Sequence, residues 1–143
     1  VWGPKLFASV CPGKDRFVGW ERWLESLYAA AELFGAGNVY TAMVAGVELE
    51  PEHGGLSIDE ALANALDGAR TLLGHGVIPL WSIYWPLWGT THPERLVPLR
   101  EYFERLNAEY AKVRAEHHTK VKPSFQCQAC AYMQLEVDLD LLF

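Results

Sequence analysis

Two stretches of the chain share one pattern: Asn38–Glu48, NVYTAMVAGVE, and Val77–Gly89, VIPLWSIYWPLWG. Each is a run of β-branched and aromatic residues, bounded by glycine, that opens into a loop with polar residues. Such runs are typical of buried strands. A helical pattern follows each run, so the sequence predicts two consecutive strand–loop–helix units with parallel strands near 39–46 and 77–84. In folds of this kind, ligands bind at the carboxyl ends of the strands.

Three amphipathic helices are expected around these strands, at 20–34, 57–73 and 94–117. In the first, apolar residues recur every three or four positions, at Trp20, Trp23, Leu24, Leu27, Ala31 and Phe34. The second opens with a capping box, Ser57 to Glu60. The segment Gly3–Gly19 is expected to be irregular, with one helical turn around Leu6–Val10. The fold class is α/β, a partial (β/α) barrel of the TIM type with an irregular C-terminal tail.

Composition narrows the function further. The chain has 143 residues, half of them apolar, with a net charge of −6 and a pI near 5.3. An acidic chain without basic clusters is a poor partner for nucleic acid or a membrane surface, and no apolar run approaches the roughly 20 residues of a membrane span. Three cysteines suit a reducing compartment. We expect a cytoplasmic protein, and because Val1-Trp2 reads as the end of a strand, a fragment of a longer one.

Both strands end in residues suited to contact a ligand. After the first, Gly46 would let the backbone approach a planar ligand, and Glu48 could accept hydrogen bonds from it. The alternative for this end is a strand that turns out of the sheet with a solvated glutamate. After the second, aromatic side chains from Tyr84 onward stand beside proline, glycine and threonine, which fits an adenine or sugar contact. The alternative for these aromatics is a place in the core.

The order of these motifs resembles the later half of the radical S-adenosylmethionine (radical SAM) barrel. Thr41–Glu48, TAMVAGVE, is similar to the GxIxGxxE-like motif of that superfamily, with Val44 in the isoleucine position, although Ala42 replaces its first glycine and Glu48 comes one place early. Ile83–Thr90 is similar to the segment that lines the same adenine in that family. Cys11–Asp15, CPGKD, with the helix after it, is similar to relatives of the biotin-synthase type. The resemblance covers roughly residues 1–116.

The resemblance implies an enzyme that reductively cleaves S-adenosylmethionine to a 5′-deoxyadenosyl radical, which abstracts a hydrogen from a small-molecule substrate. An electron donor such as flavodoxin or ferredoxin is implied as partner. The implied adenosine-binding residues are Val44, Gly46, Glu48, Ile83, Tyr84 and Trp85. The family's CxxxCxxC motif, which holds a 4Fe–4S cluster, does not occur in this sequence. Residues 1–118 would then be the C-terminal portion of the barrel, inactive alone, with the cluster ligands in a missing N-terminal part.

The tail, residues 119–143, contains a CxxC pair, Cys127 and Cys130. Two thiolates at this spacing can share one metal, and Cys11, His117 or His118 would complete the site. The pair is interpreted as a possible auxiliary Fe–S site or, alternatively, as the centre of a small Fe–S or zinc redox module. Two ordinary thiols remain a third interpretation. A plain (β/α)-barrel lyase or aldolase is less favoured because neither strand ends in lysine.

Other polar residues on the loops have two interpretations each. Lys14 and Asp15 are substrate contacts or solvated charges, and His53 and His92 are acid–base groups or exposed side chains. Cys11 lies at the barrel mouth or is a small buried thiol. The histidines at 117 and 118 suit the negative end of a helix dipole. Alternating acidic residues in the tail are expected to form a solvated face: Glu136, Asp138 and Asp140.

Overall fold

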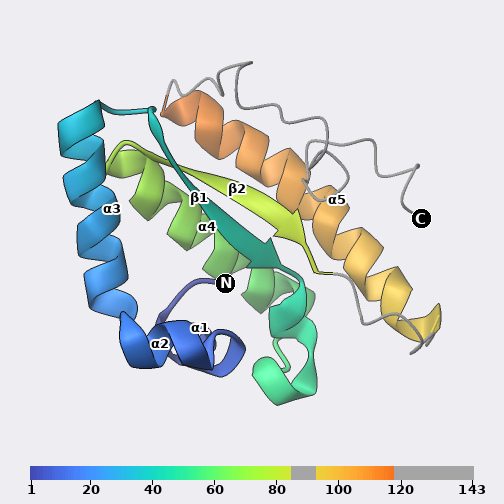
Figure 1. Ribbon diagram of the computed structural model, residues 1–143. Coiled ribbons are helices and arrows are strands. Elements are labelled where there is room, and N and C mark those ends of the chain that lie inside the picture. Colours follow the sequence, from blue (N-terminus) through green and yellow to red (C-terminus); the bar gives the residue numbers. More distant parts are fainter. Residues whose placement is uncertain (85–92, 118–143) are drawn as a thin grey trace.

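Two parallel strands form the centre of the fold (Figure 1). This computed structural model describes residues 1–84 and 93–117, and of 93–97 it describes the backbone. Strand β1 (Val39–Ala45) pairs with β2 (Val77–Ile83) from Val39 opposite Val77 to Ala45 opposite Ile83. The register has no offset, so the carboxyl ends of the two strands lie side by side. The two predicted strands and their parallel pairing are confirmed.

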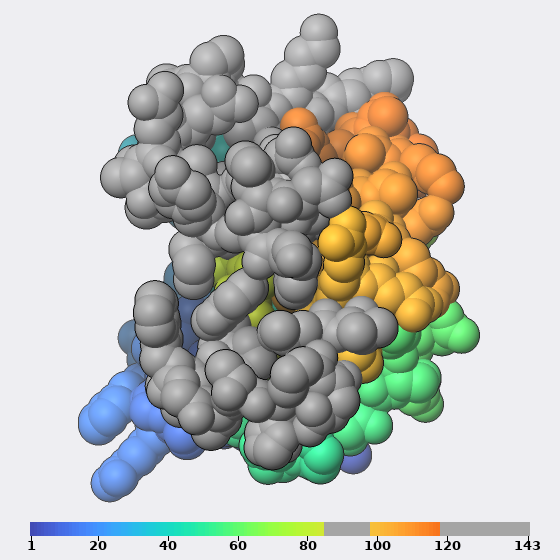
Figure 2. Space-filling model, turned by 90° about the vertical axis from the view of Figure 1, so that its right-hand side faces the viewer, coloured from blue at the N-terminus to red at the C-terminus, as the bar shows by residue number. Residues whose placement is uncertain are grey.

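Three long helices accompany the strands: α3 (Trp20–Phe34), α4 (Ile58–Gly74) and α5 (Pro93–Glu116). In Figure 1, α4 crosses behind the strands, with α3 and α5 to either side. Helices α4 and α5 pack together, and their surfaces adjoin in Figure 2. An ion pair joins them, in which Arg105 of α5 lies 2.6 Å from Asp59 of α4. The three predicted helices are confirmed to within about a residue or two at their ends.

Alternate strand residues pack toward the helices. Trp81 of β2 lies edge-to-face with Tyr110 of α5, with ring centroids 5.9 Å apart, and the Tyr110 hydroxyl donates to the Pro79 carbonyl at 2.7 Å. Side chains of a strand alternate between its two faces. The buried strand residues on the face of Trp81 are Thr41, Met43, Ala45, Val77, Pro79 and Ile83. This face therefore carries the core between sheet and helices.

Helix α4 begins at the predicted capping box. The Ser57 hydroxyl accepts from the Glu60 amide at 3.3 Å, and the Glu60 carboxylate accepts from the Ser57 amide at 2.9 Å. Two amide groups that the first helical turn leaves unpaired are thereby satisfied. The prediction for this helix start is confirmed.

The expectation for Gly3–Gly19 was right about a helical turn at Leu6–Val10, which lies within a helix, but wrong about an irregular remainder. This segment folds into two short helices, α1 (Pro4–Val10) and α2 (Pro12–Phe17). Both prolines stand in the first turn of a helix, where the missing amide hydrogen costs nothing. Each proline therefore starts a helix in a segment that was expected to be mostly irregular.

Residues Val1 and Trp2 are not part of a strand, contrary to expectation. The Val1 nitrogen nevertheless donates to the Val44 carbonyl at 2.7 Å, whereas the next carbonyl of β1, that of Ala45, accepts from Tyr84. Successive carbonyls of a strand point to opposite edges, so Val1 lies along the edge of β1 that faces away from β2. The barrel that further strands would complete remains a prediction.

Among the helices of residues 1–84 and 93–117, none combines the length and the apolar character that a membrane crossing requires.

Candidate functional site

The ends of β1 and β2 lie side by side. Val44 is paired with Ser82, and the Tyr84 amide donates to the Ala45 carbonyl at 2.8 Å. By strand alternation, Val44, Ser82 and Tyr84 share the face opposite Ala45 and Ile83. All three are half-buried, whereas Ile83 is 3% exposed in the core. Of the implied adenosine contacts, the structure therefore brings Val44 and Tyr84 together on one face and places Ile83 on the other.

Gly46 adopts a left-handed conformation directly after β1, with φ +99° and ψ −22°. A Cβ at this position would lie 2.8 Å from Leu99 Cδ2 and 3.0 Å from Phe103 Cζ, both in α5. A glycine is required here for two reasons, the positive φ and the close approach of α5. The packing of α5 explains this glycine, independently of any ligand that approaches its backbone.

Glu48 is buried in the 3-10 turn η1 (Val47–Leu49) that follows, with 2% of its surface exposed. One carboxylate oxygen accepts from the Gly46 amide at 3.0 Å, and the other accepts from the Tyr102 hydroxyl of α5 at 2.6 Å. We call these contacts the Glu48 bridge. The alternative of a solvated glutamate is wrong, because this carboxylate points inward and joins the strand-end loop to α5.

Burial, and secondarily the negative charge of Glu48, raises the pKa of Tyr102 well above its ordinary value. The hydroxyl therefore stays protonated and donates. Tyr102 was not among the predicted site residues. The sequence nevertheless contains a signal for it. Tyr102 is three residues after Leu99 and four before Leu106, which predicts that it lies on the buried side of the helix. A buried tyrosine hydroxyl generally needs a hydrogen-bond partner.

Three of the remaining candidates have side-chain contacts within the protein, and Asp15 is half-buried in α2. His53, at the end of η2 (Pro51–His53), is half-buried with Nδ1 3.0 Å from the Ser9 hydroxyl. The Lys14 ammonium lies 4.5 Å from the centroid of a Trp23 ring, a cation–π contact. The His117 Nδ1 donates to the Val113 carbonyl at 2.9 Å, at the C-terminal end of α5 as the dipole argument expected.

The described residues offer no ready metal centre. Cys11 is half-buried between α1 and α2 with a free thiol, and nowhere in 1–84 and 93–117 do three histidine, cysteine or acidic side chains gather to hold a metal. Several predicted residues lie outside the described part: Trp85, His92, His118, Cys127, Cys130, Glu136, Asp138 and Asp140.

Comparison with known proteins gives one informative similarity. The chain is 30% identical over 89 residues to a bacteriochlorophyllide c C-7(1)-hydroxylase of Chlorobaculum limnaeum. The match covers 62% of this chain but 19% of the hydroxylase, so the chain spans a small part of that relative's length. No family model matches the sequence, and no solved structure matches it. The similarity supports an enzyme in general terms.

Proposed function

We propose that this chain is the C-terminal barrel portion of a radical SAM enzyme, with strand ends that contact the adenosine of S-adenosylmethionine. Two facts support the proposal. The residues that resemble the family's adenine motifs stand at adjacent ends of parallel strands, and the chain is 30% identical over 89 residues to a hydroxylase, which is an enzyme. The observation that carries most weight is the bond from Tyr84 to Ala45, because it fixes the second motif beside the first.

The strand-end residues fit an adenosine in part. Val44 and Tyr84 offer an aliphatic and an aromatic side chain, half-buried on one face, which suits a flat purine. The Gly46 amide and both Glu48 oxygens are engaged in the Glu48 bridge. We therefore assign contact to Val44 and Tyr84, and assign to Gly46 and Glu48 the shape of the loop. Ile83 supports the strand from the core side.

When bound, S-adenosylmethionine would supply the radical chemistry, and the chain's own residues would orient the adenosine and exclude water. The described residues contain no ligand set for the 4Fe–4S cluster, so the proposal assigns the cluster to other parts of a longer enzyme. It also includes a small-molecule substrate and a reductant such as flavodoxin or ferredoxin. The auxiliary site and the metal-module alternative both depend on Cys127 and Cys130 and stay predictions.

The test is an amide NMR titration of this chain with S-adenosylhomocysteine, a stable analogue of the cofactor. We expect shifts at Val44–Gly46 and Ser82–Tyr84. Tyr84→Ala should weaken binding about tenfold, since stacking of a base on an aromatic ring is worth about 1–3 kcal/mol.

The matched control is Tyr28→Ala, because Tyr28 is also half-buried but stacks on His75, before the opposite end of β2. Binding by this variant should equal that of the wild type. Shifts confined to other regions, or equal losses in both variants, would contradict the proposed contact.

A further inference from the structure

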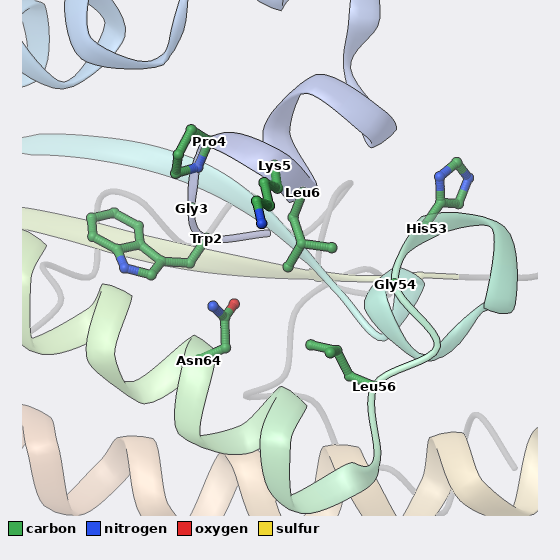
Figure 3. Close-up of a pocket in the computed structure, with 9 residues that line it drawn as sticks. All are labelled: Trp2, Gly3, Pro4, Lys5, Leu6, His53, Gly54, Leu56 and Asn64. Atoms are coloured by element: carbon green, nitrogen blue, oxygen red, sulfur yellow. The ribbon is translucent and has the colours of Figure 1, made fainter.

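A cavity of about 520 Å³ opens between the start of α1, the turn η2 and the first turns of α4 (Figure 3). It borders the end of β1, because Trp2 in its wall follows Val1, which is bonded to Val44. Its volume lies in the range of about 300–1,000 Å³ that small-molecule sites occupy. The residues that line it are Trp2, Gly3, Pro4, Lys5, Leu6, His53, Gly54, Leu56 and Asn64.

One wall of the cavity is rigid. The Trp2 indole nitrogen donates to Asp67 at 3.0 Å, and its ring lies so close to Gly68 that a Cβ there would be 2.6 Å from Trp2 Cδ2. Helix α4 thus holds the indole from two adjacent residues. Across the space stand Leu6 and Leu56 (Figure 3), so most of the lining is apolar.

Two polar side chains, Lys5 and Asn64, point into the same space (Figure 3). Within the part of the chain that the structure describes, no hydrogen bond or ion pair joins either side chain to another residue. The third polar group, His53, is held at the edge by its contact with Ser9. An ammonium and an amide that converge beside an apolar wall favour a ligand with one anionic group and an apolar body.

We propose that this cavity binds a small amphipathic anion, such as a medium-chain carboxylate. Its apolar part lies between Trp2 and the two leucines, and its anionic group meets Lys5 and Asn64. This site is separate from the proposed adenosine contact: one wall is held by α4, whereas Val44 and Tyr84 lie at the strand ends on the sheet face opposite Ala45 and Ile83. The two proposals can therefore fail independently.

The test compares octanoate with 1-octanol, which has the same chain without the charge, by amide NMR titration of the whole chain. Octanoate should shift the amides of Trp2, Lys5, Leu56 and Asn64, with a dissociation constant on the order of 1 mM or tighter. Lys5→Gln should weaken octanoate about fivefold, as expected for one exposed ion pair, and leave 1-octanol unchanged. Lys112→Gln, on the exposed side of α5, is the matched charge control and should change neither.

A second variant tests the cavity itself. Leu56→Trp, which fills the space, should abolish the binding of both probes while the amide spectrum elsewhere stays folded; if it unfolds the protein, Asn64→Phe replaces it. Shifts confined to other surfaces, or no binding at all, would overturn the site. Equal affinity for both probes, or no effect of Lys5→Gln, would overturn the anionic specificity.

Discussion

The segment after β1 has two halves that use their polar groups in opposite ways. In the first half, Glu48 and Glu50 are 2% and 5% exposed, and Glu48 is bonded within the protein through both oxygens. In the second half, Glu52 is exposed, and His53 and Leu56 border a cavity. The first half joins the end of β1 to α5, and the second half borders the cavity and leaves room for a ligand. A motif residue that looks ready for a ligand can thus be fully engaged in holding the loop.

The strongest test of the attached half is Gly46→Ala. The added methyl group would lie 2.8 Å from Leu99 and force a side chain into a positive φ, so we expect a loss of about 3 kcal/mol in the free energy of unfolding. Urea unfolding measures this directly. The control is Gly37→Ala, where φ is +77° but no atom lies within 4 Å of the new methyl group.

That control should lose about 1 kcal/mol, from backbone conformation alone. Equal losses in the two variants would show that α5 does not press on Gly46.

Removal of the Tyr102 hydroxyl is the next largest change. Tyr102→Phe leaves one buried oxygen of Glu48 without its donor, and we expect a loss of about 2 kcal/mol. Thermal or urea unfolding gives the value, with Tyr28→Phe as control, since Tyr28 is half-buried in α3 and stacks on His75, which precedes β2. A loss below that of the control would mean that the Glu48 bridge is not formed in solution.

The same hydroxyl predicts a pH dependence. The pKa of Tyr102 is raised in the folded protein above the ordinary value of 10.0, so unfolding releases its proton above that pH. Stability is fully present below pH 10 and should fall as pH rises further, by about 1.4 kcal/mol per pH unit for this tyrosine. Burial also raises the pKa of Tyr110, which should add a second contribution.

Unfolding measured at pH 9, 10 and 11 checks this dependence. In Tyr102→Phe the free energy of unfolding should decline less steeply with pH, by about 1.4 kcal/mol per pH unit. If the pH dependence of this variant equals that of the wild type, the raised pKa does not belong to Tyr102.

These contrasts show what the sequence could predict. Periodicity placed the three long helices because their buried faces are long and regular, as Leu99, Phe103, Leu106 and Tyr110 illustrate. The strands were predictable from their β-branched runs, and the start of α4 from the local contact of Ser57 with Glu60. Within Gly3–Gly19 the turn at Leu6–Val10 was predicted, but the second helix, α2, was not, because a proline is tolerated in the first turn of a helix and disrupts its interior.

The site was less predictable because its decisive contact joins distant residues. Glu48 and Tyr102 are 54 positions apart, and residue type alone does not tell whether a carboxylate after a strand meets a ligand or a helix. The cavity was also hidden, because Trp2, Lys5 and Asn64 form no spacing motif and meet only when α1 folds beside α4. Local signals predicted elements, whereas tertiary contacts decided which polar groups remain available.

The smallest expected change in the free energy of unfolding concerns the side chains that line the cavity. Asn64→Ala and Lys5→Gln remove side chains without a protein partner in the described residues, so each should change the free energy of unfolding by less than about 0.5 kcal/mol. Urea unfolding beside Tyr102→Phe gives the contrast on one scale. Near-zero cost at the cavity, with a large cost at the Glu48 bridge, is the pattern of a surface kept for binding rather than for stability. A loss of 2 kcal/mol at Asn64 would instead make the cavity wall part of the structural core.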